Sequence, residues 1–561
     1  MKNKIFYLFG AGVMAFSLTG CDLDINYDPY AVTDLDVAQL LTSTELDVAA
    51  TFTEGNYINA PLESYVQHTT SREADNYSMR GGSSWLGNTW EAAYKYAVKN
   101  CDEVIKQGEE AGDAIYAGIG RVLRTYTYMN LVDLWGNVPY SEANAGIESP
   151  KADSSLVIYN DLLAELNKAI AGFKDTEAAN PLSIGKNDLF YKGDKAKWLK
   201  AANTLKLKLL VQSRKAKAGI TNWQTELDNL LAENNFIGDG EDLQFPHSDA
   251  KTPSDERKAG FVDEYEGGQK SMWINPWFYE ILNGKTYNVK QNPLVGVVDP
   301  RIPYYYVNQL KATDDAMNLT DYRDGAFLSI FPGSNSGHSS ENQEQAMTCI
   351  GIYPVGGKYD DGQGGKIDGK SGNGIAPDKM LQAYSVPFMK AELVLTEGVA
   401  GDAKQLLQDG IKASIAHVNA VAKASNATVP LIGDAAVDAF LMSVNSLYDA
   451  ATAERKLEIV MTEKWIANFF NSIEAYNDIR RTGYPVLFKG NEERKIYTPY
   501  DQAVPATPLP EPLAFDCNVI LDYPRIMWYP DAETQLNNAN INNTTRGVTL
   551  TSYANVFWDV Q

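Results

Sequence analysis

The chain has 561 residues and a formal net charge of −23 at pH 7. This acidity argues against nucleic acid as a partner, because phosphates bind surfaces rich in Lys and Arg. The four cysteines include no CxxC pair and the four histidines are far apart, which disfavours a zinc or redox centre. We therefore expect no cofactor and identify no metal ligands. Two questions stay open, namely a structural cation and a disulfide between two of Cys101, Cys349 and Cys517.

Residues 1–20 have the pattern of a secretory signal peptide. Lys2 and Lys4 precede an almost wholly apolar run over residues 5–16, and small residues follow. The stretch "LTGC", which ends at Cys21, resembles the lipobox of bacterial lipoproteins, which are cut before the cysteine and acylated on it. The alternative is an ordinary signal peptide with a chance cysteine. We expect lipidation at Cys21, an acidic tether over 21–34 and no later membrane span, since no segment has 18 consecutive apolar residues.

The next part of the chain, residues 35–235, has the periodicity of helix pairs. In "WEAAYKYAVKNCDEVIKQ" the apolar residues Tyr94, Val98, Cys101 and Ile105 recur on one helical face, which predicts that the Cys101 thiol is buried. The stretch "IYAGIGRVLRTYTYMNLVDLW" repeats this pattern, and Gly108 and Gly112 lie between the two. Similar pairs follow. They resemble tetratricopeptide helix pairs, although no clean 34-residue repeat is found.

Residues 236–378 differ in composition, since they contain 19 of the 43 glycines. We expect a loop-rich subdomain there, renewed helices over 379–485 and a loop-rich part over 486–561. The predicted fold class is mainly α: stacked tetratricopeptide-like helix pairs with a large loop-rich inserted subdomain, all within one domain over 35–561.

Five stretches resemble motifs of the SusD/RagB lipoproteins, in the order typical of that family. They are "GRVLRTYTYMNLVDLWGNVPYSEA", "KWLKAANTLKLKLLVQS", "FMKAELVLTEG", "KWIANFFNSIEAYNDIRRTGYPVL" and "YPRIMWYPDAETQLNNANI". The third has "KAELVLTEG" where the family more often has "AEA", which suggests a divergent subgroup.

The resemblance implies an outer-membrane lipoprotein, exposed at the cell surface, that works without catalysis. Such proteins cap a SusC-like TonB-dependent transporter and deliver nutrient oligomers to it. The acidic residues after Cys21, Asp22 and Asp24, resemble the surface-export signal of these lipoproteins. An oligosaccharide is the expected ligand, and a peptide is the alternative. A surface glycoside hydrolase on a helical scaffold and a purely structural lid are further alternatives, although no carboxylate pair stands out as catalytic.

Two glycine-containing motifs have structural explanations. "RRTGYP" over 480–485 is typical of a helix end, with arginines in the last turn, Gly483 as a left-handed cap and Pro485 after it. "GGKIDGKS" over 364–371 fits a phosphate-loop pattern, but we reject that function because "GNGIAP" follows it and cannot begin a helix.

Candidate ligand contacts come from polar and aromatic residues in loop-like stretches. Sugars stack their apolar faces on aromatic rings and bond their hydroxyls to polar side chains. In "SREADNYSMRGGSSWLGNTW", predicted to be a loop before a helix, the candidates are Arg72, Asn76, Tyr77 and Trp85, whereas Trp90 is expected in the core. The loop-rich subdomain adds Trp273, Trp277 and Tyr305, each of which could instead be a packing residue.

Overall fold

The computed structural model describes residues 36–72, 79–267, 270–287, 291–314, 322–332, 345–487, 524–544, 546 and 555–560. Residues 37–561 cluster into one unit, and residues 1–36 form another. The signal peptide, Cys21 and the whole tether lie outside the described residues, as do Asn76, Tyr77 and Cys517.

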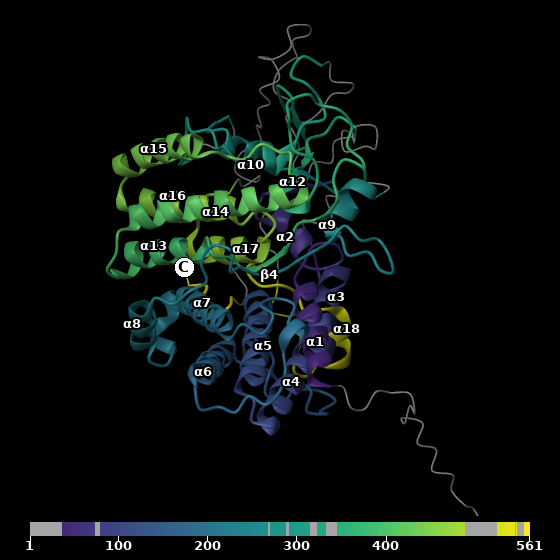
Figure 1. Ribbon diagram of the computed structural model, residues 1–561, viewed down its shortest axis with the longest axis vertical. Helices are drawn as coiled ribbons and strands as arrows, with labels where there is room; N and C mark the ends of the chain where they lie inside the picture. The colour runs from purple at the N-terminus through teal and green to yellow at the C-terminus, as the bar shows by residue number, and fades with distance from the viewer. Residues whose placement is uncertain are drawn as a thin grey trace, which may run out of the picture. The chain divides into compact units, whose positions relative to one another are not determined.

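The N-terminal part of the larger unit consists of helices, as the periodicity predicts (Figure 1). Consecutive helices α4 to α8 pack against each other in pairs. Their bounds are α1 Val37–Thr51, α2 Asn59–Tyr65, α3 Ser84–Ala92, α4 Lys99–Ala111, α5 Ala114–Trp135, α6 Ser155–Lys174, α7 Lys195–Ser213 and α8 Trp223–Glu233. A π-helical segment, η2 Ala93–Val98, joins α3 to α4, and 3-10 turns lie at η3 Gly185–Asn187 and η4 Arg214–Gly219.

The hairpin between α4 and α5 shows how local sequence sets this pairing. Gly112 ends α4 with a φ of 69°, and the Asp113 carboxylate caps α5 by accepting from the Ile115 and Tyr116 amides at 3.1 and 3.0 Å. Gly108 lies inside α4, where a Cβ would come within 2.6 Å of the Ala117 nitrogen. The two helices can approach this closely because Gly108 has no side chain. Cys101 of α4 is buried as a free thiol, as predicted.

Short elements make up the described part of residues 236–378. The described residues form five two-stranded antiparallel ladders, four of which use strands from this stretch: β1 with β5, β10 with β4, β6 with β9 and β7 with β8, whereas β2 pairs with β3 nearer the N-terminus. The strands are β1 Thr69–Ser71, β2 Val138–Pro139, β3 Ala152–Asp153, β4 Leu243–Phe245, β5 Met272–Ile274, β6 Tyr306–Val307, β7 Tyr322–Asp324, β8 Phe327–Ser329, β9 Cys349–Ile350 and β10 Asp378–Leu381. The helices between them are α9 Ala259–Phe261, η5 Val262–Glu266, α10 Pro276–Leu282, α11 Ile302–Tyr305 and α12 Ile352–Val355.

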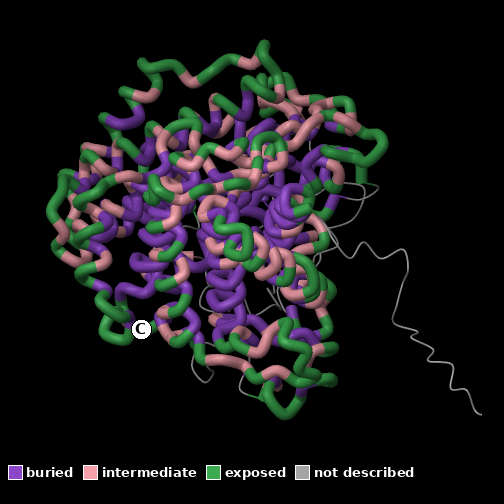
Figure 2. The backbone as a smooth tube through the Cα atoms, turned by 60° about the horizontal axis from the view of Figure 1, so that its bottom comes forward, coloured by how far each residue is buried: buried purple, intermediate pink, exposed green. Residues whose placement is uncertain are grey.

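A second group of long helices follows, and Figure 1 shows them stacked above α6 to α8. They are α13 Ser385–Glu397, α14 Ala403–Ser425, α15 Asp434–Ala450, α16 Ala453–Ala467 and α17 Ser472–Thr482, followed by the short α18 Asp531–Leu536. Gly483 caps α17 with a φ of 83°, which confirms the helix end predicted from "RRTGYP". Buried segments run through the middle of the unit and exposed ones around its edge (Figure 2). Within the described residues, no helix is long and apolar enough to cross a membrane.

Candidate functional site

The structure changes the prediction for Trp85. It lies in the first turn of α3, not in a loop, because the helix begins at Ser84. Its side chain is half-buried, and its indole Nε1 donates to the Gly55 carbonyl at 3.2 Å. Arg72 lies at the end of β1, where its amide donates to the Ser271 carbonyl at 3.0 Å. The bond to Gly55 means that Trp85 holds α3 against the turn after α1. Trp90 is 7% exposed and belongs to the core, as predicted.

Three other candidates are core residues. Trp273 in β5 and Trp277 in α10 are each 2% exposed, and Tyr305 in α11 has no exposed surface. Tyr305 stacks on Phe278 and donates its hydroxyl to the Ile466 carbonyl at 3.2 Å. A platform for a sugar needs an accessible ring face, so the prediction that Trp273, Trp277 and Tyr305 bind ligand is wrong for this structure, and packing is their role.

A groove of about 600 Å³ lies beside α3; we call it the α3 groove. Its walls are α3, the π-helical segment after it, the turn at Gly81 and Gly82, and α18, which is more than 400 residues away in sequence. The Asp531 amide donates to the Gly81 carbonyl at 2.9 Å. A Cβ on Gly81 would come within 2.3 Å of an Asp531 carboxylate oxygen, so this close approach requires glycine.

Aromatic residues form the floor of the α3 groove. The ring of Trp90 packs edge-on against Trp135 and Tyr529, at centroid distances of 5.4 and 5.7 Å, and is tilted against Tyr94 at 4.9 Å. The Tyr94 hydroxyl donates to the Pro139 carbonyl at 2.8 Å. These contacts hold both rings in place, and Tyr94, being only half-buried, offers the more accessible surface.

Polar side chains surround this floor. They come from α3 and η2 on one side and from α18 on the other: Asn88, Glu91, Lys95, Asp531 and Glu533. Asn88 donates to the Asn56 carbonyl at 3.0 Å, and Lys95 pairs with Glu91 at 2.9 Å. Leu536, 81% exposed, adds an apolar side chain at the edge. π-helical segments such as η2 occur frequently at functional sites. The groove thus combines the half-buried ring of Tyr94 with accessible carboxylate, amide and ammonium groups.

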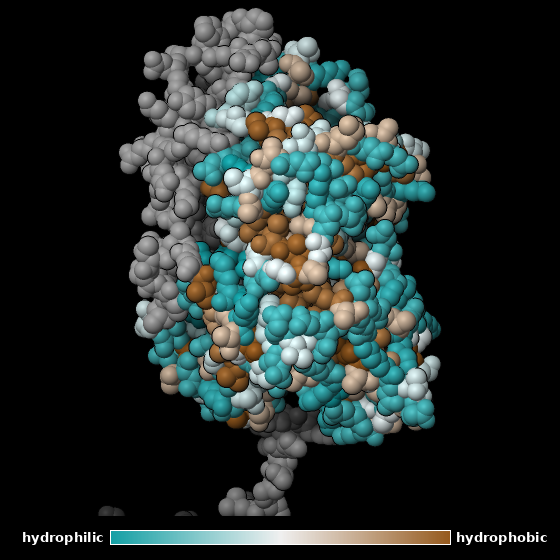
Figure 3. All heavy atoms as spheres, turned by 90° about the vertical axis from the view of Figure 1, so that its left-hand side faces the viewer, coloured by the Kyte–Doolittle hydropathy of each residue, from teal (hydrophilic) through white to brown (hydrophobic). Residues whose placement is uncertain are grey.

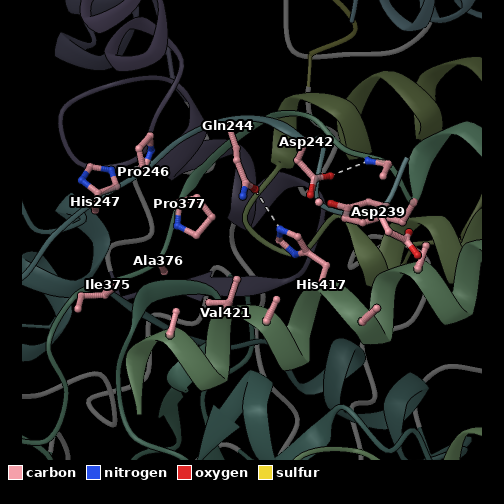
Figure 4. Close-up of a pocket in the computed structure, with 17 residues that line it drawn as sticks. Asp239, Asp242, Gln244, Pro246, His247, Ile375, Ala376, Pro377, His417 and Val421 are labelled. Atoms are coloured by element: carbon pink, nitrogen blue, oxygen red, sulfur yellow. Dashed lines mark hydrogen bonds between the residues drawn. The ribbon is translucent and has the colours of Figure 1, made fainter. Parts of the chain in front are cut away.

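A second cavity, of about 510 Å³, lies between α14 and the β4–β10 ladder; we call it the α14 pocket (Figure 4). Asp239 and Asp242 point into it at one end, and Ile375, Ala376 and Pro377 line the other. Its wall along α14 is mainly alanine.

The third hollow is apolar. Apolar residues gather in the middle of the face drawn in Figure 3. On this side of the molecule, α8 and α13 border a groove of about 380 Å³ that contains Leu231, Val394 and Leu406. Its Lys390 ammonium is already bound to the Asn234 amide oxygen at 2.9 Å. Because the Lys390 ammonium already has this partner, it is less available to orient a small ligand.

A family model described as starch-binding and associating with the outer membrane, SusD-like, matches residues 29–505. The chain belongs to the SusD-like family. Comparison with curated protein sequences gives no match. Among solved structures, a chitin-binding protein superposes with a TM-score of 0.66 at 20% identity, covering 94% of this chain and 100% of its own. A chitin-binding SusD homologue from Flavobacterium johnsoniae superposes with a TM-score of 0.63 at 18% identity, covering 93% of this chain and 98% of its own. A SusD homologue from Bacteroides fragilis superposes with a TM-score of 0.66 at 16% identity, covering 94% of this chain and 99% of its own. These likenesses confirm the predicted fold class.

In this SusD-like protein, the stretch 71–90 singled out from the sequence borders the α3 groove, although Arg72 and Trp85 are not among the residues that line it. The spacing of Ser84, Gly87, Glu91 and Lys95 by three or four residues marks one polar helical face and could have indicated the groove. Nothing local could have indicated that α18 forms the opposite wall.

Proposed function

We propose that this protein is a non-enzymatic outer-membrane lipoprotein that binds nutrient oligosaccharides in the α3 groove and delivers them to a SusC-like TonB-dependent transporter. The family match over residues 29–505 carries the proposal. The names of two structural neighbours, both chitin-binding, support a glycan as the ligand. Cys21 is the proposed lipid attachment site, and the family's association with the outer membrane supports the proposed location at the cell surface.

The chemistry of the α3 groove suits a sugar. A pyranose ring has an apolar face, which would pack on Tyr94 and Leu536, and hydroxyls, which would bond to Asn88, Asp531 and Glu533. The segment with Asn76 and Tyr77 joins Arg72 to Met79, close in sequence to Gly81 of the groove. We therefore retain Arg72, Asn76 and Tyr77 as proposed contacts, with Trp85 as a support for α3.

The binding should be weak. Two aromatic or aliphatic side chains that each shield about 100 Å² contribute roughly 5 kcal/mol at ~25 cal/mol/Å², and association costs remove several kcal/mol of this. A dissociation constant between about 1 µM and 1 mM, or roughly −8 to −4 kcal/mol, is expected. Such affinity suits a protein that must release its cargo.

Gly87 offers a direct test, because a Cβ there meets no atom within 4 Å and points into open space at the groove. In Gly87→Phe the ring should fill the groove and weaken the best ligand of a starch and chitin oligosaccharide panel at least tenfold, measured by calorimetry. Ser446→Phe, which places the same ring on the exposed surface of α15, is the control and should bind normally.

Three outcomes would count against the proposal. Unchanged binding in Gly87→Phe would place the site elsewhere. Binding of peptides in preference to every glycan would favour the peptide alternative. Release of shorter sugars during long incubation would make the protein a hydrolase.

A further inference from the structure

The α14 pocket is a separate site with its own chemistry. Along α14, the alanines recur at helical spacing on the side that faces the β4–β10 ladder: Ala413, Ala416, Ala420 and Ala424. Three of them are exposed, and their small side chains leave the wall of the pocket open. Val421, Ile375 and Pro377 complete an apolar surface. A volume of about 510 Å³ falls within the range of small-molecule sites, roughly 300–1,000 Å³.

Two carboxylates define the polar end. One oxygen of Asp242 accepts from the Ala383 amide at 2.7 Å. Burial raises the pKa of Asp242 to about 6, and the charge of Asp239 adds to this effect. In the part of the chain that the structure describes, neither Asp239 nor Asp242 forms an ion pair within 4 Å.

The basic residues around the pocket compensate the carboxylate charge only in part: the charge of Lys379 lowers the pKa of Asp242, but burial raises it by more. Burial and the charge of Lys379 lower the pKa of His417 to about 3, so its ring is neutral at pH 7. Its Nε2 lies 3.0 Å from the Gln244 amide oxygen and its Nδ1 lies 3.3 Å from the Tyr353 hydroxyl, an arrangement that fits the neutral ring with the proton on Nε2. The Lys379 ammonium donates to the Phe469 carbonyl at 2.6 Å.

His247, at the apolar end, is also engaged. Its two ring nitrogens contact the Glu256 carbonyl at 2.9 Å and the Asp378 carboxylate at 2.8 Å. Its polar atoms are therefore bonded to the wall and do not compete for a ligand near Asp242.

We propose that the α14 pocket binds a small primary ammonium compound with a short hydrocarbon chain. The ammonium would lie between Asp239 and Asp242, and the chain would extend over Ala420 and Val421 toward Pro377 (Figure 4). A bare metal ion would gain nothing from the alanine wall, and a neutral hydrocarbon would leave the two carboxylates unpaired. This site does not depend on glycan binding in the α3 groove.

Pentylammonium is a suitable probe, and 1-pentanol and pentanoate are its neutral and anionic counterparts. Titration followed by NMR should give an affinity for pentylammonium at least tenfold higher than for 1-pentanol, with no binding of pentanoate. Asp242→Asn keeps the acceptor for the Ala383 amide but removes the charge. It should lower the affinity for pentylammonium at least tenfold. Ala420→Phe, at an exposed helical position, should block the binding of both pentylammonium and 1-pentanol. Asp438→Asn on α15, a carboxylate far from the pocket in sequence, should bind as the unmodified protein does.

The affinity for pentylammonium should also fall as the pH drops below about 6, where Asp242 takes up a proton. Equal affinity for pentylammonium and 1-pentanol, or unchanged binding in Ala420→Phe, would overturn the proposal. Ala420→Phe keeps the test decisive if Asp242→Asn does not fold.

Discussion

Glu392 of α13 accepts two parallel hydrogen bonds from the Arg481 guanidinium of α17, at 2.9 and 2.7 Å, and both side chains are fully buried. Arg214, at the end of α7, donates to the same carboxylate at 2.7 Å. This cluster connects three helices from distant parts of the chain. It also gives the second arginine of "RRTGYP" a role beyond the helix dipole, because its charge compensates a fully buried carboxylate.

Replacing Arg481 by leucine should strongly destabilise the protein. Without the Arg481 guanidinium, Glu392 keeps only one arginine and Asp478 loses a contact. Loss of one member of a buried ion pair typically lowers the free energy of unfolding by about 3–5 kcal/mol. Urea denaturation measures the change. Arg455→Leu is the matched control, since its pair with Glu458 is partly exposed, and should cost less than about 1 kcal/mol. Equal losses in both variants would contradict this explanation.

The same cluster predicts sensitivity to acid. Burial opposes ionisation of Glu392, but the charges of Arg481 and Arg214 outweigh it and lower its pKa from 4.5 to about 2. A carboxyl with a lowered folded-state pKa contributes stability above the unfolded pKa and loses it as the pH falls. Between pH 4.5 and 2 this loss amounts to about 3 kcal/mol. In Glu392→Gln the unfolding free energy should depend less on pH over this range, and an identical dependence would exclude Glu392 as the cause.

Two glycines should respond in opposite ways to alanine. At Gly87 a Cβ meets open space on a helix, so Gly87→Ala should raise the free energy of unfolding by about 0.5–1 kcal/mol. At Gly108 a Cβ would lie 2.6 Å from the Ala117 nitrogen, so Gly108→Ala should lower it by about 1–3 kcal/mol. Thermal and urea unfolding of both variants check the sign. The same sign for both would mean that the helix approach at Gly108 is looser than described.

Cys21→Ala should prevent lipid attachment. The unmodified protein should incorporate labelled fatty acid and fractionate with the outer membrane, whereas the variant should do neither. Cys101→Ala serves as a control because Cys101 is buried in the folded unit. A Cys21→Ala variant that still takes up fatty acid would rule out Cys21 as the attachment site.

Gentle detergent extraction should recover the protein with a TonB-dependent barrel. This expectation follows from the proposed function, and mass spectrometry of the affinity-purified complex identifies the partner. Recovery of the protein alone, under conditions that preserve complexes of related proteins, would argue against the partnership.

The sequence by itself determined the features that depend on neighbours along the chain. Apolar spacing placed Cys101 and Trp90 on buried helical faces, and Gly112 and Gly483 ended their helices, because these effects act within one or two turns. Tertiary structure alone decided the rest. Trp273, Trp277 and Tyr305 face the core because distant segments pack over them. Gly81 meets Asp531, and Arg481 meets Glu392, through contacts that no local periodicity encodes. The α3 groove and the α14 pocket each form between elements far apart in sequence, so their walls exist only once the helices have packed.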